Sequence, residues 1–218
     1  MGGGKTQRRP PRAGRVVVGD LARPRKRILA TMPRDDRDAI AMLERSHRKL
    51  ERRLADLAGA ARALADGTAT RVELFVAREV RDYLQRSAVR HVDDEEQSIF
   101  PRLAGEPRAS ALIAQLQAEH REHDALHAEL AELLGRIERP RCPPALAAAL
   151  VDVADRLRAA YDAHIAREDS ELLPALAGWL DPGELETVHA EMRARRPGGE
   201  GRDRRRGGGG GGGKKRPR

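Results

Sequence analysis

Two segments of the chain decide its fold: His91-Val92-Asp93-Asp94-Glu95-Glu96-Gln97-Ser98-Ile99-Phe100-Pro101 and His164-Ile165-Ala166-Arg167-Glu168-Asp169-Ser170-Glu171-Leu172-Leu173-Pro174. They align at an offset of 73 residues, and in each a histidine stands four residues before a glutamate. His47-Arg48 matches His120-Arg121 at the same offset. The chain therefore contains an internal repeat, and each copy supplies one lone histidine and one His-x-x-x-Glu pair.

Four long stretches around these segments carry apolar residues at steps of three and four, which predicts amphipathic helices. The first helix is expected to begin at residues 33–36 and to end at residues 66–67, and the second to begin at Thr68 or Thr70 and to end at Pro101. The third is expected to begin at Pro107 and to end before Pro140, and the fourth to begin at residues 143–144 and to end at Pro174. A shorter helix is expected over residues 182–193. The fold class is all-α: an antiparallel up-down-up-down four-helix bundle with a short extra C-terminal helix.

The repeated polar residues predict a metal site inside this bundle. Residues four apart lie on one face of a helix, so His91 with Glu95, and His164 with Glu168, can each direct an imidazole and a carboxylate at one point. Two buried glutamates side by side are costly without a compensating cation. Four imidazoles and two carboxylates suit two iron ions, although the ligand types also accept manganese or zinc.

The third predicted helix offers further histidines. His123 and His127 lie on the same apolar side as His120. Their counterparts in the other half of the repeat are leucines, so they are additions to the symmetric set, and either is a candidate for an extra metal ligand that makes the two metal positions inequivalent. The alternative is that neither binds. Glu96 and Asp169, each one residue beyond a candidate ligand, are expected beside the site or at the surface rather than on the metal.

These motifs resemble those of the hemerythrin-like, or HHE cation-binding, family. The resemblance rests on residues 46–50, 91–101, 119–124 and 164–174, and it covers roughly residues 36–176. It implies a four-helix bundle around a non-haem diiron centre with an oxo or hydroxo bridge. It further implies four terminal ligands, His47, His91, His120 and His164, and two bridging carboxylates, Glu95 and Glu168.

Composition and charge separate the centre of the chain from its ends. The chain has 218 residues, of which 2% are aromatic and 35% charged, and this disfavours a β-sandwich or β-barrel. Residues 1–33 hold nine Lys/Arg against one acid, and residues 195–218 hold ten against two. We expect both ends to be disordered basic arms around a bundle at residues 34–194. A start at Met32 would remove the N-terminal arm.

The compartment is predicted from what the sequence lacks. No apolar run reaches the roughly 18 residues that a membrane span needs, and no signal-peptide core is present. A lone cysteine, Cys142, cannot form an internal disulfide. We therefore expect a cytoplasmic protein.

Three functions remain open at this point. The first is a diiron protein that binds or senses dioxygen, nitric oxide or redox stress. The second is a diiron redox enzyme acting on peroxide; a ferritin-like carboxylate enzyme is disfavoured, because its Glu-x-x-His spacing occurs only at Glu44/His47 and Glu186/His189. The third is a nucleic-acid-associated module with a structural metal site, whose basic arms attract nucleic acid or another acidic partner without sequence specificity. The simpler interpretation of the arms is that they are solvated low-complexity extensions.

Overall fold

The computed structural model describes Met1 and residues 38–196, and every regular element in that part of the chain is helical. The predicted start of the first helix at residues 33–36 and almost all of both basic arms lie outside the described residues. None of the described helices is long and apolar enough to cross a membrane.

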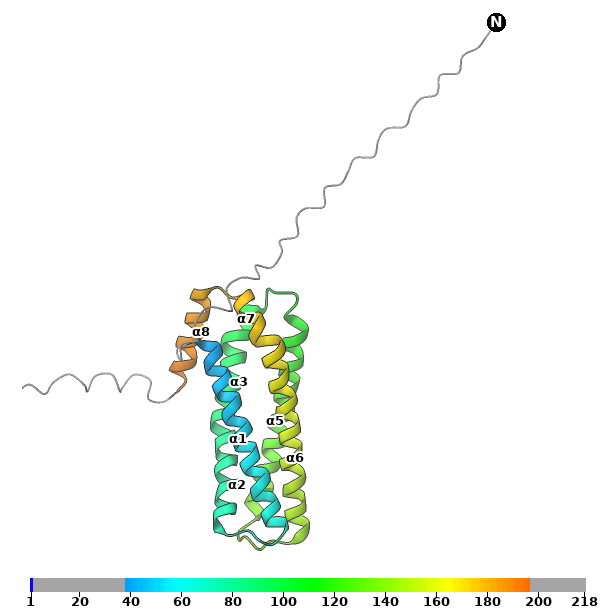
Figure 1. The fold of residues 1–218 in the computed structure, drawn as a ribbon, viewed down its shortest axis with the longest axis vertical. Helices are drawn as coiled ribbons and strands as arrows, with labels where there is room; N and C mark the ends of the chain where they lie inside the picture. Colours follow the sequence, from blue (N-terminus) through cyan, green and yellow to red (C-terminus); the bar gives the residue numbers. More distant parts are fainter. Residues whose placement is uncertain (2–37, 197–218) are drawn as a thin grey trace, which may run out of the picture.

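Four long helical stretches lie side by side along the length of the molecule (Figure 1). The first is α1 (Ala39–Ala65), and the third is α5 (Ser110–Arg136). The second is a continuous run of α2 (Arg71–Tyr83), η1 (Leu84–Ala88), α3 (Val89–Asp94), η2 (Glu95–Ile99) and α4 (Phe100–Leu103). The fourth is the run of α6 (Pro144–Arg167), η3 (Glu168–Leu172) and α7 (Leu173–Trp179), and the short helix α8 (Pro182–Ala194) follows it.

Capping residues explain where several helices begin. The Asp38 side chain accepts a hydrogen bond from the Ile40 amide at the start of α1. Thr70 and Glu73 form a capping box at the start of α2, as Asp181 and Glu184 do at the start of α8. Gly67, with φ of 70°, turns the chain after α1 in a conformation that side chains disfavour. The turn between α1 and α2 is therefore encoded locally.

The expectation that Pro101 and Pro174 end their helices is wrong, because each helix continues past its proline. A π-helical turn precedes each one, and in both turns an amide bonds to the carbonyl five residues earlier: Phe100 to Glu95, and Leu173 to Glu168. The changed hydrogen-bond register places each proline in the first turn of a new α-helical segment, where its missing N–H costs little.

The third helix begins later than the sequence predicts. Residues 107–109 form a turn, and α5 starts at Ser110 after Ala109, whose amide bonds to the Glu106 carbonyl. Pro107 therefore belongs to the connection and not to the first turn of the helix.

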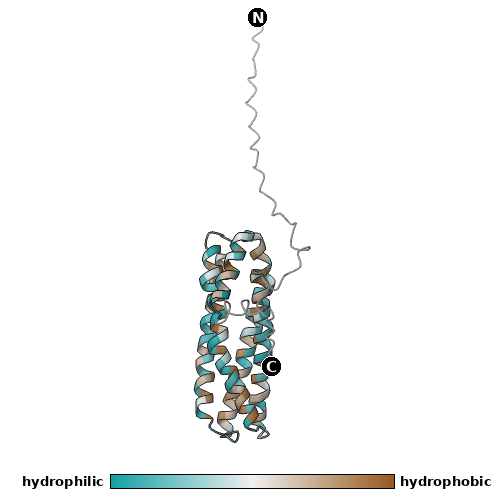
Figure 2. Ribbon diagram, turned by 90° about the vertical axis from the view of Figure 1, so that its left-hand side faces the viewer, coloured by the Kyte–Doolittle hydropathy of each residue, from teal (hydrophilic) through white to brown (hydrophobic). Residues whose placement is uncertain are grey.

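The hydrophobic core has two parts with the polar residues of the repeat between them. One cluster includes Leu57, Leu134 and Leu150, and the other includes Leu43 and Leu116; all five side chains are fully buried. Hydrophobic and hydrophilic residues alternate along the long helices (Figure 2). Burial of each such leucine stabilises the bundle by about 1.5–3 kcal/mol. The bundle is thus held from both sides of a buried polar layer.

Helix α8 lies beside α1 at one end of the bundle (Figure 1) and is tied there by charge. Arg195 and Arg196, which the sequence analysis assigns to the C-terminal arm, pair with the fully buried Asp94 at 3.1 and 2.6 Å. Arg102 pairs with Glu191 at 2.7 Å. Two residues beyond the predicted boundary at 194 thus contact the helices through their side chains.

Candidate metal centre

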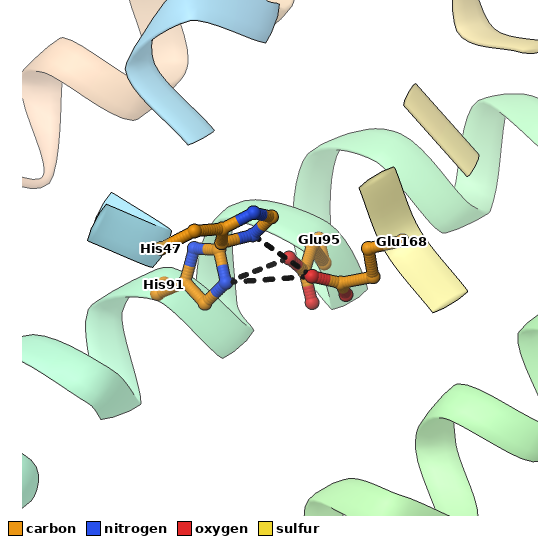
Figure 3. Close-up of side chains that lie close together, drawn as sticks. All are labelled: His47, His91, Glu95 and Glu168. Carbon is orange, nitrogen blue, oxygen red and sulfur yellow. Dashed lines mark ion pairs between the residues drawn. The ribbon is translucent and has the colours of Figure 1, made fainter. Parts of the chain in front are cut away.

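One group of candidate ligands converges between α1, α3, η2 and η3 (Figure 3). Nε2 of His47 lies 2.9 Å from a carboxylate oxygen of Glu168, and Nε2 of His91 lies 3.1 Å from Glu95. Nε2 of His91 also lies 3.8 Å from Glu168. The ligand atoms of these four residues all lie within 4.8 Å of one another, so one ion can reach all of them.

A second group shares both glutamates with the first. Nε2 of His120, from α5, lies 3.1 Å from Glu95, and Nε2 of His164, from α6, lies 3.1 Å from Glu168. These four residues meet the same 4.8 Å limit, and all of them are buried. Two histidines on each side and two shared carboxylates are the arrangement in which a carboxylate can bridge two metal ions.

The two glutamates lie where the helices become irregular. Glu95 is the first residue of η2 and Glu168 the first residue of η3. A π-helical turn rotates the residues that follow it relative to a regular helix, and such turns are common at functional sites. In each half of the repeat, a π-helical turn and a proline thus follow the carboxylate.

The unsatisfied polar atoms test whether the residues suit a metal. Nε2 of His47, His91 and His120 and both carboxylate oxygens of Glu95 and Glu168 are buried and make no hydrogen bond within the described structure. The nitrogen and oxygen atoms face one another at 2.9–3.1 Å without hydrogen-bond geometry. Buried polar groups without partners are costly, and a cation between them satisfies all of these atoms together. The residues therefore fit a metal ion in each group.

Carboxylates outside the two groups orient three of the four histidines. Nδ1 of His47 donates to Asp169 at 2.9 Å, and Nδ1 of His120 donates to Glu96 at 2.8 Å. A hydrogen bond from Nδ1 to a carboxylate leaves the lone pair of Nε2 free on each ring. Metal-binding histidines are usually supported in this way. The expectation that Glu96 and Asp169 lie beside the site holds.

His164 has a similar carboxylate partner that the sequence analysis does not single out. Its Nδ1 donates to Glu119 at 2.9 Å, and Glu119 is itself paired with Arg167 at 2.6 Å. The sequence signal that could have identified Glu119 is its position as an acidic residue directly before the candidate ligand His120. The repeat counterpart of Glu119 is Ser46, and Nδ1 of His91 has no hydrogen-bond partner among the described residues.

The carboxylates change the proton affinities of the histidines. Burial lowers the pKa of His47 and of His164, but the nearby Glu168 and Glu95 outweigh it and raise these values to about 8 and about 9. Burial raises the pKa of Glu168, yet His164, His47 and His91 hold it well below its ordinary value. Without metal, the site is therefore a network of protonated imidazoles around a carboxylate.

The ligand atoms of the two additional histidines do not fall in either group. Nε2 of His127 is already hydrogen-bonded to the hydroxyl of Tyr161 at 3.0 Å. The His123 ring stacks on Tyr161 at 3.9 Å and lies edge-on to His164 at 4.9 Å. Burial, together with the charges of His164 and His120, lowers the pKa of His123 to about 3, which keeps the ring neutral. His123 thus lies next to the second group, whereas Nε2 of His127 is already occupied by its hydrogen bond to Tyr161.

Comparison with known proteins supports the geometry. A search of curated proteins finds no match to the chain. The family model of the hemerythrin HHE cation binding domain matches residues 38–176, which include both candidate groups and the helices that carry them. The chain therefore belongs to the hemerythrin HHE cation-binding domain family.

Proposed function

We propose that the chain holds a non-haem diiron centre that binds or senses dioxygen or nitric oxide. In this proposal His47 and His91 hold one iron, His120 and His164 hold the other, and Glu95 and Glu168 bridge them. The helices form an antiparallel up-down-up-down four-helix bundle that brings these ligands together. The observation that carries the proposal is the sharing of two buried, unsatisfied carboxylates by two pairs of histidines.

The donor set favours iron over the alternatives. All six ligands are imidazoles or carboxylates, and Cys142, the one cysteine of the chain, lies in the connection between α5 and α6. Nitrogen and oxygen donors suit iron, whereas structural zinc is usually held by four ligands that include thiolates. Each group offers four ligand atoms, so an ion that prefers six retains positions for a small molecule.

When bound, the two irons supply the redox chemistry and the affinity for a diatomic molecule. The chain itself orients the ligands and excludes water. Asp169, Glu96 and Glu119 hold the Nδ1 protons of three histidines, so that Nε2 of each ring faces the centre. The leucine clusters on both sides keep bulk solvent from the carboxylates. The candidate ligands are therefore buried and oriented before any small molecule binds.

Spectroscopy under controlled ligand exposure tests the proposal. The iron-loaded chain is reduced with dithionite and exposed without air to nitric oxide, then to dioxygen, while near-ultraviolet and visible absorption is recorded. We expect a saturable spectral change with each gas and no sustained turnover. Continuous consumption of hydrogen peroxide would instead establish the redox-enzyme alternative, and no spectral response to any of the three would contradict the proposal.

A further inference from the structure

A groove between α5 and α6 leads from the surface toward the second group of ligands. Its volume is about 400 Å³, and three alanines, Ala159, Ala160 and Ala163, form its α6 side. His123 lines it from α5. We call this feature the α5–α6 groove. Small side chains leave it open, but they do not by themselves make it a site.

His123 gives the groove a polar inner end. The side chain is 2% exposed, and its Nδ1 atom has no hydrogen-bond partner within the described structure. A buried ring nitrogen without a partner is costly unless something binds it. The ring lies edge-on to His164 at 4.9 Å, so a molecule that bonds to His123 lies next to the second group.

The corresponding positions in the other half of the repeat carry mostly larger side chains. A hollow of about 400 Å³ lies on α1 beside Lys49 and Arg53, and Leu50 does not line it. At the offset of 73 residues, the three alanines correspond to Arg86, Ser87 and Arg90, and His123 corresponds to Leu50. Arg90 donates to the Ser87 hydroxyl at 2.9 Å, so these larger side chains bond to each other across the surface.

Cations also lie over the ring of Tyr83, in the same half of the repeat. Lys49 Nζ lies 5.0 Å and the Arg53 guanidinium 5.8 Å from the centre of the Tyr83 ring. The two halves of the repeat thus share the ligand pattern and differ in the side chains at the surface beside it.

The charges of the α5–α6 groove disfavour anions. Arg156, at its mouth, is already paired with Glu129 at 3.0 Å and Asp152 at 3.2 Å. Glu119 is paired with Arg167 and His164. Neither charge is free to bind an ion of opposite sign, and the exposed Glu122 repels anions. The lining therefore suits a small neutral molecule better than an anion.

We propose that the α5–α6 groove is the entry port for a small neutral diatomic molecule, and that His123 donates a hydrogen bond to it at the inner end. The port serves the half of the centre held by His120 and His164. This inference rests on the proposed function, because it names the route by which the ligand reaches that site.

A first test needs no iron. Dissolved dioxygen is paramagnetic and speeds the NMR relaxation of protons that it approaches, so the iron-free full chain is measured with and without oxygen pressure. We expect at least threefold greater enhancement at the His123 ring protons than at the methyl groups of its counterpart Leu50. Ala160→Leu removes this difference, and Ala148→Leu, at an exposed alanine on the same helix, preserves it. Equal enhancement at His123 and Leu50 would overturn the proposal.

A second test follows nitric oxide binding to the reduced, iron-loaded chain by stopped-flow absorption. Ala160→Leu is expected to slow association at least tenfold while the final spectrum stays that of the unchanged protein. Ala148→Leu leaves the rate unchanged. If Ala160→Leu does not fold, Ala163→Leu replaces it, because that alanine is exposed. An unaltered rate in the folded leucine variant overturns the port. A chain that binds no iron overturns the proposed function instead, and the relaxation measurement then still decides whether the groove admits the gas.

Discussion

Nδ1 of His47 lies 2.9 Å from a carboxylate oxygen of Asp169, 122 residues away in the sequence. At the offset of the repeat, the same contact recurs between His120 and Glu96 at 2.8 Å. Each acid directly follows a glutamate that both ligand groups share. One helical turn of each half thus provides a candidate bridging carboxylate for the centre and a hydrogen-bond acceptor for a histidine of the other half.

The outer carboxylates are expected to set metal affinity without binding metal. Asp169→Asn removes the charge that orients His47, and supporting residues of this kind change metal affinity by about 10- to 100-fold. Competition with a chelator measures the effect. Asp162→Asn, at an exposed position on α6, is the matched control and leaves affinity unchanged. Equal affinities for the Asp169 variant and the unchanged chain would remove Asp169 from the site.

The two additional histidines are expected to differ from His120. His127→Ala leaves the number of bound metal ions unchanged, because Nε2 of His127 already bonds to Tyr161. His120→Ala removes a member of the second group and lowers the metal content by about one ion per chain. Elemental analysis after dialysis distinguishes them. Loss of metal from the His127 variant would make that residue a ligand after all.

The stability of the metal-free chain is expected to fall in mildly alkaline solution. The pKa values of His47 and His164, about 8 and about 9, exceed the ordinary 6.5, so the folded chain binds their protons more tightly than the unfolded chain. Their contribution is complete below pH 6.5 and is lost as the pH rises through 8 to 9. Denaturant midpoints at several pH values measure it.

Acid is expected to remove a different contribution. The pKa of Glu168 lies well below 4.5 in the folded chain, so its stabilisation is present above that pH and is lost as the pH falls. Metal binding must displace the imidazole protons, so metal affinity rises with pH as metal-free stability falls. A metal-free chain whose stability does not change between pH 6.5 and 9 would contradict the assigned network. A His47→Gln variant whose stability depends on pH as that of the unchanged chain does would contradict it as well.

The attachment of α8 is expected to depend on Asp94. Asp94→Asn removes a fully buried charge that faces Arg195 and Arg196, and the cost is about 2 kcal/mol because both arginines are partly exposed and can be hydrated. Hydrogen exchange should then rise in α8 before the rest of the bundle. Asp93→Asn, at the preceding residue, is the control, because the Asp93 side chain accepts its hydrogen bond from Gln97 and not from α8. Uniform exchange in both variants would refute this attachment.

The sequence predicts much of this arrangement because periodicity and spacing are local properties. The repeat identifies six residues that the structure brings into two groups, and the apolar steps predict the helices that carry them. The π-helical turns escape prediction, because a proline has the same chemistry whether it ends a helix or begins a new segment. The pairing of Asp94 with Arg195 joins residues 101 positions apart, and no local pattern specifies it.

The difference in surroundings between the two additional histidines also depends on the fold. His123 and His127 share one helix face in the sequence, and only the position of Tyr161 on α6 separates them. The same holds for Glu119, whose contact with His164 spans 45 residues. Sequence reasoning thus reaches the residues that repeat and misses those that break the repeat.

Metal content per chain, measured by elemental analysis on protein purified in the presence of iron, tests the central claim most directly. We expect about two irons per chain in the unchanged protein and fewer than one after Glu168→Gln, because that carboxylate belongs to both groups. A single zinc ion per folded chain, or two irons that persist after Glu168→Gln, would contradict a diiron centre bridged by Glu95 and Glu168.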